Sequence, residues 1–396
     1  MKLKFPCKSL LALSVAIPAL AHAQSSVTLY GIIDEGLNYQ SNAGGPARYS
    51  LASGVLQGSR WGLKGKEDLG SGYAAIFVLE NGFDVNTGAL GQGSRMFGRQ
   101  AYVGLSSDRY GSIMLGRQYD SLVTSIGDFA VGDQWGGYIA AHPGDLDNFN
   151  NTFRVNNAIK YASANYGGFS FSATYAPGGI AGDVTGNQIW AVGANYAGAG
   201  LRVGAAYLNA RTPNQGLFGN SSATALTSAS ASLSSPVTSG FISAHDYGVA
   251  AVAASYDFAQ TSVGFTYSNT RFSGLGNLSA GTNPLGYRGA ASFNNVEVNG
   301  KYQLTPAFLV GAAYDYTVGG SVESKSGEKP DARYHQFAIG ADYFLSKRTD
   351  LYLTGIYQKA SGVDSRGVIA VAAINNVTPA SGNHVGLVRV GIRHKF

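Results

Sequence analysis

Charged residues make up only 13% of the 396-residue chain, and those present separate by sign along the sequence. In the segment GSRWGLKGKEDL, the cations Arg60, Lys64 and Lys66 occupy positions of one parity. Successive side chains of a strand point to opposite faces, so an extended segment would display these cations together. Between residues 120 and 154 the charges are nearly all acidic. Cations on one surface and carboxylates on a facing one would create an electric field across the space between them.

Catalytic or metal chemistry has little support in the same sequence. Nucleophilic hydrolases need a His beside Ser or Asp, and the Gly-x-Ser-x-Gly turn that often carries the nucleophile is absent. The acidic residues lack the spacing of a calcium loop, and GAGLRVG at residues 198–204 lacks the Lys and the helix of a phosphate loop. We therefore expect no enzymatic activity, no metal site and no cofactor.

The first 23 residues have the pattern of a secretory signal peptide. Three lysines within eight residues precede the apolar run SLLALSVAIPAL, and a small-x-small cleavage site ends at Ala23. We predict a cleaved signal at residues 1–23 and one mature domain at residues 24–396. No later stretch reaches the roughly 20 apolar residues of a membrane-spanning helix. Because the signal holds three lysines, the mature net charge is +2 rather than +5, and we expect no nucleic-acid partner.

The mature sequence contains sixteen alternating segments of about ten residues, from VTLYGIIDEGL to the final HVGLVRVGIRHKF. Its 55 Gly, 24 Tyr and 19 Phe favour an all-β protein over a helix bundle. Tight turns such as EDLGSG and SDRYGS alternate with longer links, and this alternation is typical of an outer-membrane β-barrel. A propeller or solenoid would show a repeat of fixed length instead. The longer links are expected at residues 40–52, 86–96, 120–154, 211–244, 272–291, 319–332 and 361–383.

The last segment is patterned to its final residue. Val388, Val390, Ile392 and Phe396 share one parity, and the cations occupy the other. Lipid tolerates no open sheet edge, so we expect this strand to pair with VTLYGIIDEGL at the start of the mature chain. The prediction is an all-β fold, a 16-stranded antiparallel transmembrane β-barrel.

A barrel of 16 strands leaves an aqueous channel, whose selectivity depends on the charges where it is narrowest. The longest link, at residues 120–154, is the candidate for narrowing it, and its aromatic residues favour an ordered loop. Alternation allows Arg60, Lys64, Arg99 and Arg154 to face the interior.

Several motifs together resemble the general porins of Gram-negative bacteria, most of all those of beta-proteobacteria. They are SSVTLYGIIDEGL, SRWGLKGKEDLGSGYAAIFVLENGF, FGRQAYVGL, GSIMLGRQYD, RVNNAIKY and VGIRHKF. The resemblance implies a homotrimer in the cell outer membrane, in contact with lipid and lipopolysaccharide. Each barrel would be a water-filled pore for passive diffusion of small hydrophilic solutes and ions, with the third extracellular loop folded inward. It also implies that the outer-membrane assembly machinery reads the terminal aromatic residue, here Phe396.

The resemblance also implies roles for particular residues at the pore constriction. The family's arginine cluster corresponds to Arg60, Arg99 and Arg154, and its lumenal glutamate to Glu80. Asp128 and Asp133 are the nearest candidates for the loop carboxylates, and with Glu80 they form the predicted acidic side. Lys64 is assigned to the basic wall by its parity. Because cations outnumber anions at this point, we expect weak anion selectivity.

Other functions remain open at this stage. The sequence is equally compatible with a channel specific for phosphate or small organic anions. A surface adhesin could use the link at residues 211–244, which is rich in Ser, Thr and Ala. A barrel enzyme is the alternative of a different class. Arg117 is undecided, because the equivalent residue in the family tends to meet a neighbouring subunit.

Overall fold

The computed structural model describes residues 26–212, 233–277, 283–320, 322–325, 327 and 329–396. The predicted signal peptide and most of the Ser-, Thr- and Ala-rich link lie outside these residues. The described strands form one antiparallel sheet. They are β1 (Ser26–Gln40), β2 (Arg48–Ser53), β3 (Arg60–Gly70), β4 (Tyr73–Gly82), β5 (Gln100–Ser107), β6 (Gly111–Gln118), β7 (Val155–Ala162), β8 (Phe169–Ala176), β9 (Ile189–Gly198), β10 (Leu201–Arg211), β11 (Asp246–Phe258), β12 (Thr261–Leu275), β13 (Gly289–Thr305), β14 (Phe308–Gly319), β15 (Arg333–Phe344), β16 (Thr349–Ser361) and β17 (His384–Lys395).

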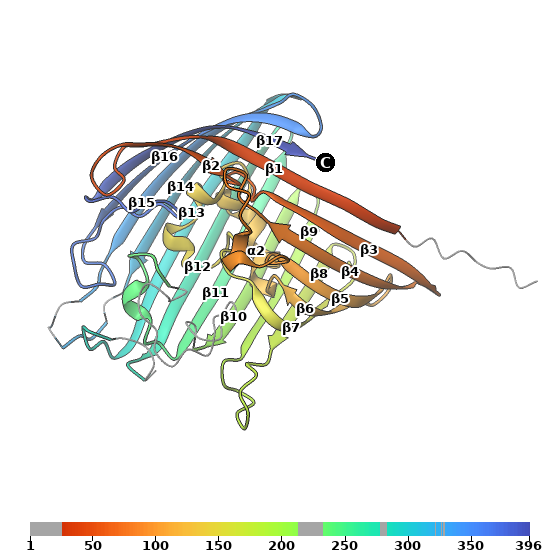
Figure 1. The fold of residues 1–396 in the computed structure, drawn as a ribbon, viewed down its shortest axis with the longest axis horizontal. Helices are drawn as coiled ribbons and strands as arrows, with labels where there is room; N and C mark the ends of the chain where they lie inside the picture. Colours follow the sequence, from red (N-terminus) through yellow and green to blue (C-terminus); the bar gives the residue numbers. More distant parts are fainter. Residues whose placement is uncertain (1–25, 213–232, 278–282, 321, 326, 328) are drawn as a thin grey trace, which may run out of the picture.

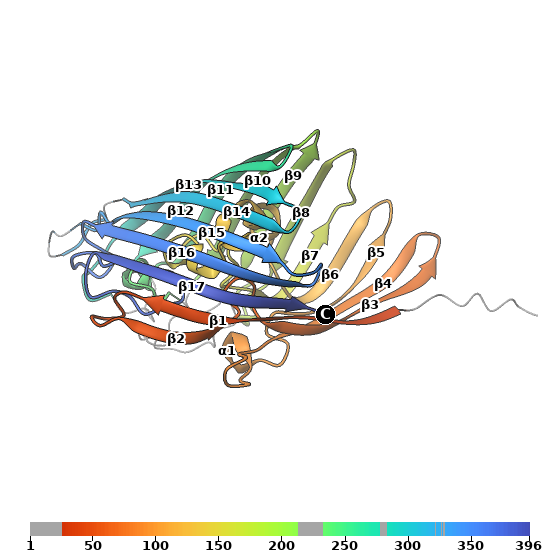
Figure 2. The same cartoon turned by 90° about the horizontal axis from the view of Figure 1, so that it is seen from above.

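The sheet closes on itself between its first and last strands (Figures 1 and 2). β17 pairs with β1 from Ile32 opposite Lys395 to Gln40 opposite Leu387. The Phe396 N–H donates to the Gly31 carbonyl at 3.0 Å, and the Gly31 N–H donates back at 3.1 Å. The predicted closure, down to the last residue, is therefore confirmed.

The described residues form seventeen strands, yet the barrel has sixteen. β2 and β3 both pair with β1, so they are two parts of one interrupted barrel strand. The prediction of sixteen strands is confirmed, but the expected link at residues 40–52 is wrong in its second half, where β2 already begins at Arg48. Turn-forming residues are concentrated in SNAGGPA, just before β2, and the strand RYSLAS is too short for a clear alternation.

The two faces of the barrel differ as the alternation predicts. On β17, Val388, Val390 and Ile392 are 46%, 57% and 46% exposed on the outer face, whereas Arg389 on the inner face is fully buried. Apolar side chains that remain exposed around the whole ring form the surface that faces lipid. No helix in the described part of the chain is long and apolar enough to cross a membrane.

Most of the segment between β6 and β7, residues 120–153, lies against the polar face of the sheet, within the ring of strands in Figure 1; we call these residues the inner loop. It contains α2 (Ser121–Ile126) and the short helices η1 (Gly127–Phe129), η2 (Val131–Asp133), η3 (Tyr138–Ala140) and η4 (Pro143–Asp145). α2 begins directly after Asp120, because that carboxylate accepts the Val123 N–H at 2.9 Å and so caps the helix. One further helix, α1 (Gly91–Ser94), follows β4.

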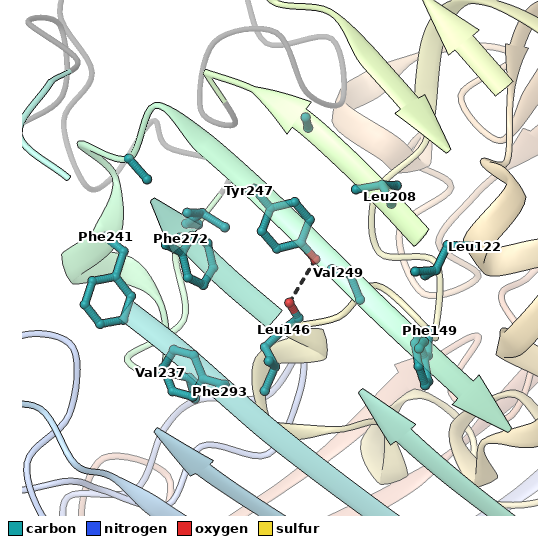
Figure 3. Packing of buried hydrophobic residues seen from close by; sticks show 14 of the residues in the cluster. Leu122, Leu146, Phe149, Leu208, Val237, Phe241, Tyr247, Val249, Phe272 and Phe293 are labelled. Atoms are coloured by element: carbon teal, nitrogen blue, oxygen red, sulfur yellow. Dashed lines mark hydrogen bonds between the residues drawn. The ribbon is translucent and has the colours of Figure 1, made fainter. Parts of the chain in front are cut away.

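A buried aromatic cluster fixes the segment after the undescribed link. Phe241 of η6 (Ser239–Phe241) packs against Phe272 and Phe293, and the Tyr247 hydroxyl donates to the Leu146 carbonyl at 2.9 Å (Figure 3). Phe241 is fully buried. The end of the predicted surface link at residues 211–244 is thus part of a packed core above the inner loop, which its small polar composition did not indicate.

Candidate constriction site

A cavity of about 750 Å³ lies between the strand wall and the inner loop. Arg60, Arg99 and Arg154 line it from the wall, together with Tyr119. Asp128 and Asp133 line it from the loop. Three predicted cations and two predicted carboxylates, distant in the sequence, therefore lie around one space.

Arg99 and Arg60 share one counter-ion, the Glu80 carboxylate, which lies closer to Arg99. The Arg99 Nε donates to Glu80 Oε1 at 2.8 Å, and its Nη2 donates to the Tyr119 hydroxyl at 2.7 Å. The Arg60 Nη1 lies 4.0 Å from the same Glu80 oxygen. The Tyr30 hydroxyl donates to the other Glu80 oxygen at 3.0 Å. One carboxylate therefore serves two guanidinium groups.

Arg154 has much less compensation. Its side chain is almost entirely buried, and its Nη1 donates to the Thr152 carbonyl at a long 3.4 Å. Its guanidinium carbon lies 5.6 Å from the centroid of the Tyr119 ring, and Nε has no acceptor among the described residues. Burial, together with repulsion from Arg99, lowers the pKa of Arg154 to about 10. The group is still cationic at neutral pH, so the wall holds three cations and one carboxylate.

Only some of the loop acids are available to the cavity. Asp128 is exposed and its Oδ2 lies 3.1 Å from Arg202 Nη2, so part of its charge is compensated. Asp133 is also exposed to the cavity. Asp120 caps α2, while Asp145 accepts the backbone N–H groups of residues 150 and 152. These structural uses leave Asp133 as the least compensated carboxylate on the loop side.

Two predicted site residues occupy other places. Lys64 does not line the cavity; its Nζ lies 5.4 Å from the centroid of the Tyr30 ring, further along β3. Glu80 was assigned to the acidic side, but it lies on β4 beneath Arg99, within the basic wall. The role that the resemblance implies for Glu80 at the constriction stays a prediction, and the structure places its carboxylate next to Arg99 and Arg60.

The inner loop is held on the opposite wall by buried polar contacts. The His142 Nδ1 lies 2.7 Å from Asp147 Oδ2, and its Nε2 lies 3.4 Å from Glu297 Oε2 on β13. Burial alone would lower the pKa of His142, but Asp147 and Asp315 attract its charged form and raise the pKa well above its usual value. The Val131 N–H donates to Glu297 Oε1 at 2.8 Å.

Sequence reasoning did not identify Tyr119, His142 or residues 54–59 as parts of the site. Tyr119 lies in contact with Arg99 and Arg154, and residues 54–59 line the cavity. The two glycines in ASGVLQGSR are the one signal that could have indicated a break at residues 54–59. Among the described residues, no group of three or more His, Cys, Asp or Glu side chains could hold a metal ion.

Comparison with known proteins gives consistent matches. The family model described as Gram-negative porin matches residues 9–362. An outer membrane porin protein of Bordetella pertussis is 30% identical, over 97% of this chain and 98% of the relative. Outer membrane porin protein 32 of Delftia acidovorans is also 30% identical, over 98% and 99%. Among solved structures, an anion-selective porin from Comamonas acidovorans has a TM-score of 0.70 at 23% identity, over 94% of this chain and all of that one.

Proposed function

The chain belongs to the Gram-negative porin family and is an outer-membrane channel for passive diffusion, and from this premise we propose that the pore is weakly anion-selective. The residues that would cause this selectivity are Arg60, Arg99 and Arg154, the arginine wall. The observation that supports this most directly is the charge around the cavity. Arg60 and Arg99 share one buried carboxylate, Glu80, and Arg154 has none, whereas the loop offers Asp133 and a partly compensated Asp128. The name of the Comamonas acidovorans structure, an anion-selective porin, agrees with this sign.

The mechanism is a transverse field at the narrowest part of a water-filled pore. Guanidinium groups on one side and carboxylates on the other orient water and polar solutes, and the excess of fixed cations raises the local concentration of anions. Because the arginines are held by hydrogen bonds and by the Tyr119 ring, the field is fixed before a solute arrives. We expect small hydrophilic solutes to pass, with anions favoured over cations.

The test is the current through purified protein in a planar bilayer under a salt gradient. A large conductance with a reversal potential of the sign for anions supports the proposal. A cation-selective pore contradicts the selectivity while leaving the channel function intact. A small conductance blocked at low concentration by one solute, such as phosphate, favours the solute-specific alternative.

The proposal includes a homotrimer whose contact side is formed by β5, β6 and β7. These strands have eight residues each, against fifteen and seventeen in β12 and β13. Arg117 shares the parity of the exposed Ile113 and Leu115 on β6, and a guanidinium facing lipid would be destabilising. One solved neighbour, from Vibrio cholerae, is described as a trimer form. Three-step closure of the conductance is the expected result, and single-step closure contradicts the trimer.

We propose no catalytic activity for the barrel. His142 lies near Asp147 and Ser268, but the Ser268 hydroxyl donates to Asp147 at 2.6 Å and not to the imidazole. All three side chains are buried, so a substrate could not reach them. Absence of ester or peptide hydrolysis by the purified protein is the expected result, and hydrolysis lost on mutation of His142 would contradict it.

A further inference from the structure

The barrel strand that starts as β2 and continues as β3 is interrupted by residues 54–59. Ser53 pairs with Glu35 and Arg60 pairs with Ile32, so six residues on this strand oppose only two on β1. Extra residues on one strand must leave the plane of the sheet. Here they leave it on the inner side, because Val55 and Leu56 are buried and the whole segment lines the cavity. We call residues 54–59 the inner bulge.

The inner bulge is fixed to β1 by one residue. The Gly54 N–H donates to the Asp34 carbonyl at 2.7 Å, and the Gln57 N–H donates to Asp34 Oδ2 at 2.7 Å. The Asp34 N–H donates to the Ser59 hydroxyl oxygen at 3.1 Å. Hydrogen bonds at the beginning, middle and end of the segment make it a rigid projection rather than a loose loop.

The inner bulge contacts the middle of the inner loop. The Tyr138 N–H donates to the Val55 carbonyl at 2.9 Å, and Val55 packs in one cluster with Val131 and Ile139. Gly137 has φ +68°, and a Cβ there would lie 2.2 Å from the Val55 carbonyl oxygen. The loop is therefore packed tightly against this projection at Gly137 and Tyr138.

The same segment contacts two arginines of the basic wall. The Arg60 Nε donates to the Gly58 carbonyl at 2.9 Å, which fixes the direction of its guanidinium group. A Cβ on Gly58 would lie 3.0 Å from Arg99 Nη1, so the absence of a side chain leaves the space that Arg99 occupies. One short segment thus contacts both the loop and the cations that face it.

We propose that the inner bulge is a second constriction element, which sets the aperture and the anion preference by holding the loop at Tyr138 and by positioning Arg60 and Arg99. This inference rests on the proposed anion-selective pore. The inner loop alone does not define the narrow region; its middle part around Tyr138 and two arginines of the basic wall take their positions from residues 54–59. Gly58 is a positioning residue, because it acts on solutes only through the arginines.

The test is Gly58→Val, with conductance and reversal potential measured in planar bilayers. The added side chain displaces the flexible end of Arg99 and extends into the cavity, so we expect roughly a twofold fall in both the conductance and the anion-to-cation permeability ratio. Gly382→Val is the matched control, because the nearest atom to a Cβ there lies 3.9 Å away and the backbone is not left-handed. We expect the control to behave like the wild type.

Gly58→Val that assembles and keeps both wild-type values overturns the inference. If it fails to assemble, Gly58→Ala adds one methyl group that meets only the Arg99 guanidinium, and unchanged values there overturn it equally. The result is separable from the proposed function. A wild type without anion preference refutes the proposed function, whereas a preference that is lost in Arg99→Gln and kept in both Gly58 variants refutes only the role of the inner bulge.

Discussion

Arginines of the inner face occur in two environments, at the closing seam and at the constriction. At the seam, Arg389 on β17 is fully buried and has a complete set of acceptors. Its Nη2 lies 3.0 Å from Asp34 Oδ1, its Nη1 donates to Asn38 Oδ1 at 2.9 Å, and its Nε donates to the Tyr352 hydroxyl at 2.6 Å. Arg154 at the constriction has one long hydrogen bond and an aromatic ring.

The difference separates structural cations from those available to solutes. A buried guanidinium without a carboxylate is costly in a dry interior and is tolerated where it borders water. Arg389 joins the first and last strands and has no charge left for the lumen. Arg60 and Arg99 share Glu80 and Arg154 has no carboxylate partner, so net positive charge faces the cavity. Both groups of arginines face the interior of the barrel, so the number of neighbouring carboxylates and acceptors distinguishes them.

Removing the seam cation should have the largest effect. Arg389→Gln leaves Asp34 buried without its cation, and breaking one half of a buried ion pair costs about 3–5 kcal/mol. We expect a much lower midpoint of thermal unfolding in detergent. Wild-type stability in this variant would show that the seam does not depend on the pair.

Asp145 is the acidic counterpart of Arg154, a buried charged group without an ion-pair partner among the described residues. Among the described residues Asp145 takes part in no ion pair, and burial, with repulsion from Asp147, raises its pKa from 3.8 to about 6. Its native state favours the protonated form, so the stability it contributes is fully present below pH 3.8 and is lost as the pH rises through about 6. The shift corresponds to at most about 3 kcal/mol.

Asp145→Asn tests this directly, since Asn accepts the left-handed backbone at φ +46°. We expect the unfolding midpoint of the variant to fall less than that of the wild type between pH 4 and pH 7. The same decline in the variant and the wild type would show that Asp145 does not titrate in this range.

Removing a constriction cation should change selectivity more than stability. Arg154→Gln relieves repulsion from Arg99 and removes a poorly compensated charge, so we expect a free energy of unfolding within about 1 kcal/mol of that of the wild type. The anion preference should weaken in a salt-gradient measurement. A large loss of stability, with selectivity unchanged, would place Arg154 with Arg389 instead.

The smallest effect is expected at Asp128. Its side chain is 62% exposed and paired with Arg202, so Asp128→Asn should leave both conductance and reversal potential close to wild type. Asp133→Asn is the comparison, and it should strengthen the anion preference measurably. Equal effects of the two substitutions would contradict the assignment of Asp133 as the main loop carboxylate.

The barrel could be predicted from sequence because it follows from alternation, whereas the grouping of Arg60, Arg99 and Arg154 came from the resemblance to porins, since Arg99 and Arg154 lie just before β5 and β7. Parity places Val390 outside and Arg389 inside, and the terminal Phe396 requires a closing strand. The inner bulge could not be predicted, since its direction depends on Asp34 and Tyr138, which are distant in the chain.

The same limit explains the other differences. Glu80 has the expected inward face, but only the pairing of neighbouring strands brings it beneath Arg99. The packing of Phe241 depends on aromatic residues from β12 and β13, and the local sequence does not report them. Periodicity predicts which face of a strand a side chain occupies, but it does not predict contacts between side chains that are far apart in the chain.

The decisive measurement is the reversal potential of the wild type and of the double variant Arg60→Gln, Arg99→Gln under one salt gradient. We expect an anion-selective wild type and a double variant whose potential moves clearly toward that of a cation-selective pore. An identical reversal potential in the two proteins would contradict the claim that the constriction arginines set the selectivity of this porin.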